Sequence, residues 1–196
     1  MSEKSLVKRK LTTQQITITG MLSAISIVLG VTGLGYIPIP PFHTTIMHVP
    51  VIIGSLIEGP VVGAMLGLIF GLTSIFQAIK TPTPVSFIFL NPLVAVLPRI
   101  LIGITPYYTY KVLSKLKLNS IKIALATGVG SFTNTIGVLG MIYILYFDAF
   151  VKVQGISVSA ANKTFIALTL NGFVSAGAAI LITLPVVQAV NKIKKN

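Results

Sequence analysis

The sequence has no cysteine, no tryptophan and very few acidic residues. Only Glu3, Glu58 and Asp148 are acidic among 196 residues, against 15 Lys or Arg. The absence of cysteine excludes disulfides, a thiolate nucleophile and cysteine-ligated metal sites. Three widely separated acids offer no carboxylate pair for catalysis, and no Gly-x-x-x-x-Gly-Lys phosphate loop occurs. We therefore expect this chain to be no enzyme and to hold neither a metal nor a cofactor of its own.

Charged residues of both signs make up only 9% of the sequence, whereas soluble domains have roughly 25%. Hydrophobic residues make up 54%, and the mean hydropathy is +0.93. The apolar stretches run for about 20 residues, which predicts helices rather than a membrane β-barrel. We expect one membrane-embedded, all-α domain over residues 1–196.

Six apolar segments predict six transmembrane helices. They are residues 14–34, 45–58, 60–79, 86–110, 121–147 and 163–190. The second is short, and crosses fully only if the preceding loop dips into the membrane.

The basic residues predict the orientation of these spans. Eleven of the 15 lie in the amino-terminal arm, the fourth connection and the carboxyl-terminal tail. Because basic loops stay inside the cell, we expect both termini in the cytoplasm of a bacterial plasma membrane protein. This placement indicates contact with anionic lipid rather than with nucleic acid.

Arg99 is the only ionisable side chain expected deep inside a span. It lies about 13 residues into the fourth segment, near the bilayer midplane at about 1.5 Å per residue. No acid lies at a comparable depth, because Glu58 is at a turn and Asp148 at an outer end. A guanidinium pairs with carboxylate or phosphate, so the sequence favours an anionic ligand here. The alternative is that Arg99 reaches the membrane surface or binds carbonyls freed by Pro92 and Pro98.

Polar side chains at similar depth extend this hypothesis. Asn91 lies eight residues before Arg99, close to the same helical face, Asn134 is in the middle of the fifth span beside Thr133, and Asn171 is in the sixth. We expect these groups to line one outward-opening cavity between spans four, five and six. The alternative for each amide is a hydrogen bond to a neighbouring helix.

The first outer loop, residues 35–43, is uncharged and rich in proline and aromatic residues. Such a stiff loop fits a lid whose Phe42 and His43 contact the ligand, or a short turn with interfacial aromatics. His43 and His48 have no acid nearby, so they make a poor metal site. We expect His48 to be structural.

Small residues recur four apart in two spans. Gly20 and Ala24 do so in the first, and Gly59, Gly63, Gly67 and Gly71 in the third. This spacing lets helix backbones approach closely, either within the bundle or against a partner. Because buried polar residues concentrate in the last three spans, we expect the first half to dock and the second half to bind.

Taken together, these features resemble the substrate-binding S components of energy-coupling factor (ECF) vitamin transporters. The resemblance covers nearly the whole chain. Its motifs are His48–Gly54, Glu58–Gly63, Gly67–Gly71, Asn91–Pro92 and Pro98–Arg99. It implies a membrane subunit that captures a vitamin from outside and associates with a coupling membrane protein and two ATPase subunits, which use the ATP. It also implies a lid in the first outer loop, a vitamin held by the last three helices, and docking through Gly20 and Ala24.

The residue types in the expected cavity narrow the choice of vitamin. Arg99 argues for a carboxylate, and therefore for pantothenate, folate or biotin over thiamine. The lack of tryptophan disfavours flat rings such as riboflavin and folate, which gain from stacking. Pantothenate is small, hydroxylated and amide-bearing, and is the ligand we expect. The alternatives are another vitamin, a stand-alone secondary transporter, or an intramembrane acyltransferase using His43 or His48.

Overall fold

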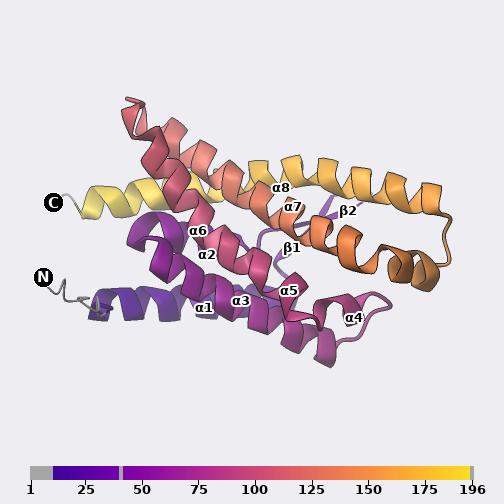
Figure 1. Cartoon of the computed structure of the whole chain (residues 1–196). Helices are drawn as coiled ribbons and strands as arrows, with labels where there is room; N and C mark the ends of the chain where they lie inside the picture. The colour runs from indigo at the N-terminus through magenta and orange to yellow at the C-terminus, as the bar shows by residue number, and fades with distance from the viewer. Residues whose placement is uncertain (1–10, 40–41, 195–196) are drawn as a thin grey trace, which may run out of the picture.

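The computed structural model describes residues 11–39 and 42–194, which form a bundle of helices with one small hairpin (Figure 1). The helices are α1 Thr13–Thr32, α2 Val49–Glu58, α3 Pro60–Lys80, α4 Ser86–Phe89, α5 Pro92–Ala95, α6 Leu97–Val112, α7 Asn119–Gln154 and α8 Val158–Ile193. A 3-10 turn, η1, covers Leu113–Lys115, and the antiparallel strands are β1 Tyr36–Ile39 and β2 Phe42–Thr45. In this part of the chain, five segments are long and apolar enough to cross a membrane. The predicted helical membrane fold is confirmed.

Local sequence signals set several of the helix boundaries. Thr12 and Gln15 form a reciprocal capping box at the start of α1, and Gly33 ends that helix in a left-handed conformation (φ 74°). Gly59 (φ 97°) followed by Pro60 separates α2 from α3. Glycine adopts positive φ without a steric penalty, and proline suits the first turn of a helix, so this pair turns the chain sharply.

The second predicted span, 45–58, needs correction. Its helix, α2, begins only at Val49 and has 10 residues, about 15 Å, which is half the thickness of the hydrocarbon core. The residues before it form the hairpin of β1 and β2 rather than more helix. The Ser175 hydroxyl, midway along α8, donates a hydrogen bond of 2.9 Å to the Thr45 carbonyl at the end of β2. The hairpin therefore enters the bundle, where backbone pairing satisfies its polar groups.

The fourth predicted span, 86–110, is not one helix. It is divided into α4, α5 and α6, with breaks at Asn91-Pro92 and before Pro98. Proline has no N–H and restricts the residue before it, which explains both breaks.

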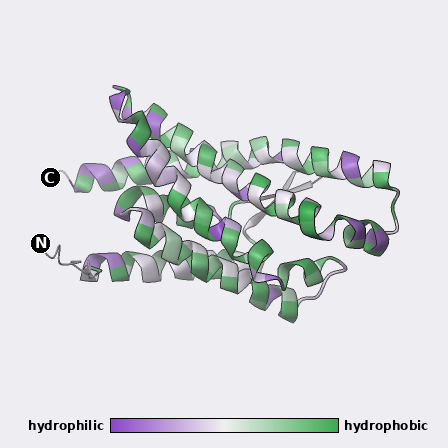
Figure 2. Ribbon diagram, viewed as in Figure 1, coloured by the Kyte–Doolittle hydropathy of each residue, from purple (hydrophilic) through white to green (hydrophobic). Residues whose placement is uncertain are grey.

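The helices α7 and α8 are longer than predicted. Each has 36 residues, or about 54 Å, well beyond the roughly 30 Å of the hydrocarbon core. Together they form a hairpin that extends past α3 at the end of the bundle opposite the chain termini (Figure 1). Hydrophilic residues gather towards the two ends of the bundle (Figure 2). The first and last helices begin and end on the same side, as an even number of crossings requires; which side is cytoplasmic stays a prediction.

The glycines of α3 pack inside the bundle against α6. A methyl group at Gly67 would collide with the Arg99 carbonyl, and one at Gly63 with the backbone of Gly103. Gly71 lies against Val96 in the same way. These glycines let the two backbones approach closely, so this stripe serves internal packing.

Candidate functional site

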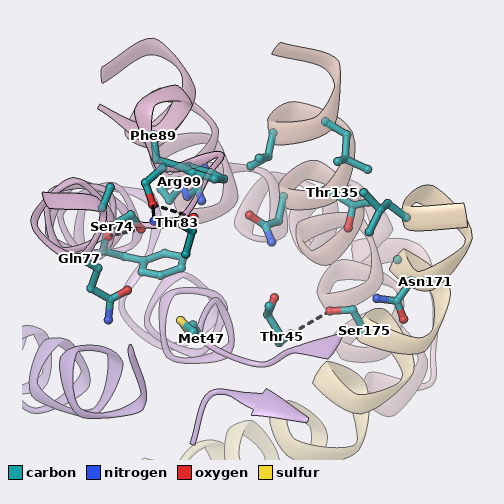
Figure 3. A pocket seen from close by; sticks show the side chains of 18 of the residues that line it. Thr45, Met47, Ser74, Gln77, Thr83, Phe89, Arg99, Thr135, Asn171 and Ser175 are labelled. Carbon is teal, nitrogen blue, oxygen red and sulfur yellow. Dashed lines mark hydrogen bonds between the residues drawn. The ribbon is translucent and has the colours of Figure 1, made fainter. Parts of the chain in front are cut away.

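A cavity of about 440 Å³ opens among α3, α4, α6, α7, α8 and the end of β2 (Figure 3). This volume lies within the range of small-molecule sites, roughly 300–1,000 Å³. Polar and apolar side chains both line it. The lining residues are Thr45, Met47, Phe70, Ser74, Gln77, Ala78, Thr81, Thr83, Ser86, Phe89, Arg99, Asn134, Thr135, Val138, Leu139, Leu168, Asn171, Gly172 and Ser175.

Arg99 stands on the first turn of α6 and is 8% exposed. Its Nη1 atom donates a hydrogen bond of 2.8 Å to the Val94 carbonyl. That carbonyl would accept from the backbone of residue 98 in a continuous helix, but Pro98 has no N–H. The guanidinium therefore donates to the carbonyl that the proline leaves without a partner, which is the alternative considered for Arg99 in the sequence. It also lines the cavity, as the anionic-ligand hypothesis expects.

Two aromatic rings flank this guanidinium. Its Cζ atom lies 5.7 Å from the ring centroid of Phe70 on α3 and 5.7 Å from that of Phe89 on α4. Cation–π attraction from both sides orients the planar group. Glu58 lies elsewhere, 2.6 Å from the ammonium of Lys194. The result is a fixed, largely buried positive charge beside two aromatic rings, where electrostatic interactions are stronger than in water.

The opposite wall of the cavity is formed by α7 and α8 and presents neutral polar groups. It carries Asn134, Thr135, Asn171 and Ser175, of which three are labelled in Figure 3. Among the described residues, none donates a hydrogen bond to the buried Oδ1 atom of Asn134. A buried acceptor without a donor is costly, so this atom is suited to a hydroxyl or amide of a ligand.

A third group of polar residues comes from the end of α3 and the loop to α4. Ser74, Gln77 and Thr83 lie on the same side of the cavity as Arg99 (Figure 3). The Ser86 hydroxyl accepts a 2.8 Å hydrogen bond from the Thr83 backbone. The cavity was expected between spans four, five and six, but α3 also supplies part of its wall. The sequence held a signal for this in the polar residues of the last turns of an otherwise apolar helix.

Two predicted site residues lie outside the cavity lining. Asn91 accepts a hydrogen bond of 2.9 Å from the Leu93 backbone, which caps α5, and donates one of 3.0 Å to the Tyr146 hydroxyl. Its predicted alignment with Arg99 assumed a continuous helix, which the break between α5 and α6 removes. Thr133 lies 3.1 Å from the Thr105 hydroxyl and so joins α7 to α6. Both residues act as contacts between or within helices, the alternative considered for the amides.

The lid residues are only partly described. The backbone of Phe42 and His43 belongs to β2, where Phe42 pairs with Ile39 and His43 with Pro38; their side chains lie outside what the structure describes. The next residues do reach the site, since Thr45 and Met47 line the cavity. His48 is fully buried, with Nε2 3.0 Å from the Ser131 hydroxyl, a contact that ties α2 to α7.

The predicted docking residues are on the outside of the bundle. Gly20 and Ala24 are both exposed on α1, and a methyl group at Gly20 would meet nothing within 4 Å. Met21 and Ile25 beside them are 63% and 48% exposed. This face of α1 is therefore open to lipid or to another protein.

Comparisons with known proteins agree with this arrangement. A family model described as "ECF transporter, substrate-specific component" matches residues 14–188. The "Pantothenic acid transporter PanT" of Lactococcus lactis subsp. cremoris is 35% identical over 170 residues, covering 80% of this chain and 82% of the relative. The "Pantothenate transporter PanT" of Leuconostoc mesenteroides subsp. mesenteroides is 29% identical over 136 residues, covering 65% of this chain and 67% of that protein.

Proposed function

Because the chain belongs to the family of substrate-specific components of ECF transporters, we propose that it captures pantothenate in the cavity beside Arg99. As a member of that family it is a multi-pass plasma membrane protein and a transporter component. The names of its two relatives favour pantothenate over other vitamins. The observation that carries the proposal is the cavity itself, with a guanidinium on one wall and amides and hydroxyls on the other.

The parts of pantothenate match the two walls. Its carboxylate pairs with the Arg99 guanidinium, which offers charge-assisted hydrogen bonds in a setting of low polarity. Its hydroxyls and amide extend towards Asn134, Asn171 and Ser175. Its two methyl groups pack against the apolar residues between the walls, such as Val138 and Leu139. Phe42 and His43 at the hairpin close over the ligand.

Energy for uptake comes from partner proteins. We propose that a coupling membrane protein docks on the exposed α1 face at Gly20 and Ala24, where small residues allow close approach. Two ATPase subunits bound to it hydrolyse the ATP, because this sequence contains no phosphate-binding loop. The ligand enters from outside, with both termini of the chain in the cytoplasm.

Calorimetry on the purified protein with pantothenate, biotin, riboflavin and folate tests the choice of ligand. We expect tight binding of pantothenate alone. Arg99→Gln, which keeps much of the side-chain volume but removes the charge, is expected to weaken pantothenate binding by about 30-fold or more, since truncating one partner of a buried charge pair costs roughly 2–5 kcal/mol.

Thr133→Val is the matched control, because Thr133 is on the same helix as Asn134 but outside the cavity lining. It is expected to bind pantothenate like the parent. Tighter binding of another vitamin would refute the choice of ligand, and unchanged pantothenate affinity in Arg99→Gln would refute the role of Arg99.

A further inference from the structure

The turn between α6 and α7 is the most basic part of the described surface. We call residues 107–122 the α6–α7 corner; they comprise the end of α6, the turn η1 and the start of α7. Its four lysines are Lys111, Lys115, Lys117 and Lys122, the first three exposed and the last half-buried. No acidic residue occurs in the sequence between Glu58 and Asp148. Asp148 is roughly 44 Å along α7 from Asn119. No acidic residue of α6, η1 or the start of α7 therefore neutralises the four lysines.

Exposed apolar side chains alternate with these lysines. Val112 is 78% exposed, Leu118 63% and Tyr108 53%, and Leu116 and Ile121 are also exposed. A turn in water would hide such side chains or replace them with polar ones. At a membrane surface the same pattern is favourable, because the apolar side chains enter the acyl region while the lysine ammonium groups remain at the phosphates.

The corner is held in a defined shape. The Tyr110 hydroxyl at the end of α6 donates a hydrogen bond of 2.6 Å to Oδ1 of Asn119 at the start of α7. The ammonium of Lys122 lies 5.3 Å from the centroid of the Tyr110 ring. These contacts join the two helices across the turn, so the lysines are presented with little loss of backbone freedom on binding.

We propose that the α6–α7 corner is a binding site for anionic phospholipid, with lysines on the headgroup phosphate and Val112 and Leu118 among the acyl chains. Two features favour lipid over a soluble anion. The exposed apolar residues match acyl chains and have no use in binding free phosphate. The tyrosines at the end of α6 are typical of the membrane–water interface, which places the corner at headgroup depth.

The corner is separate from the proposed docking face. It lies on the opposite side of the bundle from α1 (Figure 1).

The absence of tryptophan makes a direct test available. Tyr108→Trp introduces a single tryptophan at the corner, whose fluorescence is measured in nanodiscs of phosphatidylcholine and phosphatidylglycerol in equal amounts. In one sample the phosphatidylglycerol carries brominated chains, which quench nearby tryptophan, and in the other the phosphatidylcholine does. We expect the anionic lipid to be preferred roughly fivefold or more, because each lysine near an anionic surface contributes about a fivefold gain.

Substitution of the corner lysines should remove the preference. In the Tyr108→Trp background, Lys111, Lys115, Lys117 and Lys122 are all changed to Gln. The matched control changes Lys80, Lys152 and Lys163 to Gln at the other end of the bundle and is expected to retain the preference. A milder variant, Lys115→Gln with Lys117→Gln, alters only exposed side chains and is expected to lose part of the preference for anionic lipid. The test therefore does not depend on whether the fourfold variant folds.

Three results would overturn the proposal. The first is equal quenching by both lipids in the Tyr108→Trp protein. The second is a preference that survives loss of all four lysines. The third is loss of the preference on adding inorganic phosphate at constant ionic strength, which would assign the corner to a soluble anion. Salt at about 1 M, by contrast, is expected to weaken the lipid preference through screening.

Discussion

Two helices of this protein carry small residues four apart, and the structure uses the two stripes differently. On α1, Gly20 and Ala24 face outward, with nothing within 4 Å of a methyl group at Gly20. On α3, Gly63 and Gly67 lie directly against the backbone of α6. The four-residue spacing alone does not tell an exposed stripe from a buried one. The stripe on α3 is buried because α6 packs against it, with Gly103 of α6 facing Gly63.

The α3 stripe supports the cavity wall, although none of its four glycines lines the cavity. Gly67 lies against the carbonyl of Arg99, so the close approach of α3 fixes the first turn of α6. One turn further along α3, Phe70 reaches the Arg99 guanidinium. The internal stripe therefore positions the Arg99 guanidinium that we propose binds the ligand, whereas the outer stripe is exposed.

The largest effect is expected from Gly67→Leu. The new side chain cannot fit against the Arg99 carbonyl, so α3 and α6 must separate, at a cost of about 3 kcal/mol or more. Thermal unfolding should show a much lower Tm, and calorimetry should show loss of pantothenate binding. Gly177→Leu is the control, because nothing lies within 4 Å of a methyl group at that position on α8. A Gly67→Leu protein with normal Tm and affinity would break the comparison.

The next effect concerns the outer stripe. Gly20→Leu should leave Tm and pantothenate affinity unchanged, because the new side chain enters open space. It should reduce recovery of the coupling protein and ATPases in co-purification by about tenfold or more, since a bulky residue prevents close helix approach. Gly177→Leu serves again as a control for added bulk. Normal recovery with Gly20→Leu would place the docking face elsewhere.

A smaller change is expected inside the cavity. A methyl group at Gly172 would lie 2.9 Å from Cγ2 of Thr135, so Gly172→Ala forces the threonine side chain to turn. We expect pantothenate affinity to fall about three- to tenfold with a stability change near 1 kcal/mol. Adding Thr135→Ser removes the clashing methyl group but keeps the hydroxyl, and should restore part of the affinity. If it restores none, the loss does not arise from this contact.

The smallest effect separates two neighbouring threonines of α7. Thr135 lines the cavity, whereas Thr133 bonds to Thr105 on α6. Thr135→Val should weaken pantothenate binding about fivefold through loss of one hydrogen bond of roughly 1 kcal/mol, while Thr133→Val should change only stability. Calorimetry and thermal unfolding on both variants give the comparison, and the reverse pattern would contradict the assigned orientation of α7.

Sequence reasoning found the residues whose burial is chemically unusual. Arg99, Asn134 and Asn171 stand out because polar groups are costly in hydrocarbon, and all three line the cavity. The helical fold followed equally directly from the long apolar segments. In both cases the hydrocarbon of the membrane restricts which residue types can be buried at a given position, so the sequence alone is informative.

The structure differs from the sequence predictions where the outcome depends on how helices pack. The predicted alignment of Asn91 with Arg99 needs a continuous helix, and the helix is broken between them. Thr135 lines the cavity and Thr133 does not; the two lie about 200° apart around the helix, and residue type alone does not show which of them faces inward. The part of α3 in the cavity was not predicted, because polar residues such as Ser74 and Gln77 are common near the end of an apolar helix and give only a weak signal. The hairpin lacks the alternating pattern of a typical strand pair, so the sequence does not predict the pairing of β1 with β2.

The most direct test of the account compares two ligands on two proteins. Pantothenate and panthenol, the alcohol in which a hydroxymethyl group replaces the carboxylate, are titrated by calorimetry into the parent protein and into Arg99→Gln. If the carboxylate binds Arg99, the parent should prefer pantothenate by about 100-fold, and this preference should fall to a few-fold at most in the variant. An equally strong preference for pantothenate in both proteins would show that another group recognises the carboxylate.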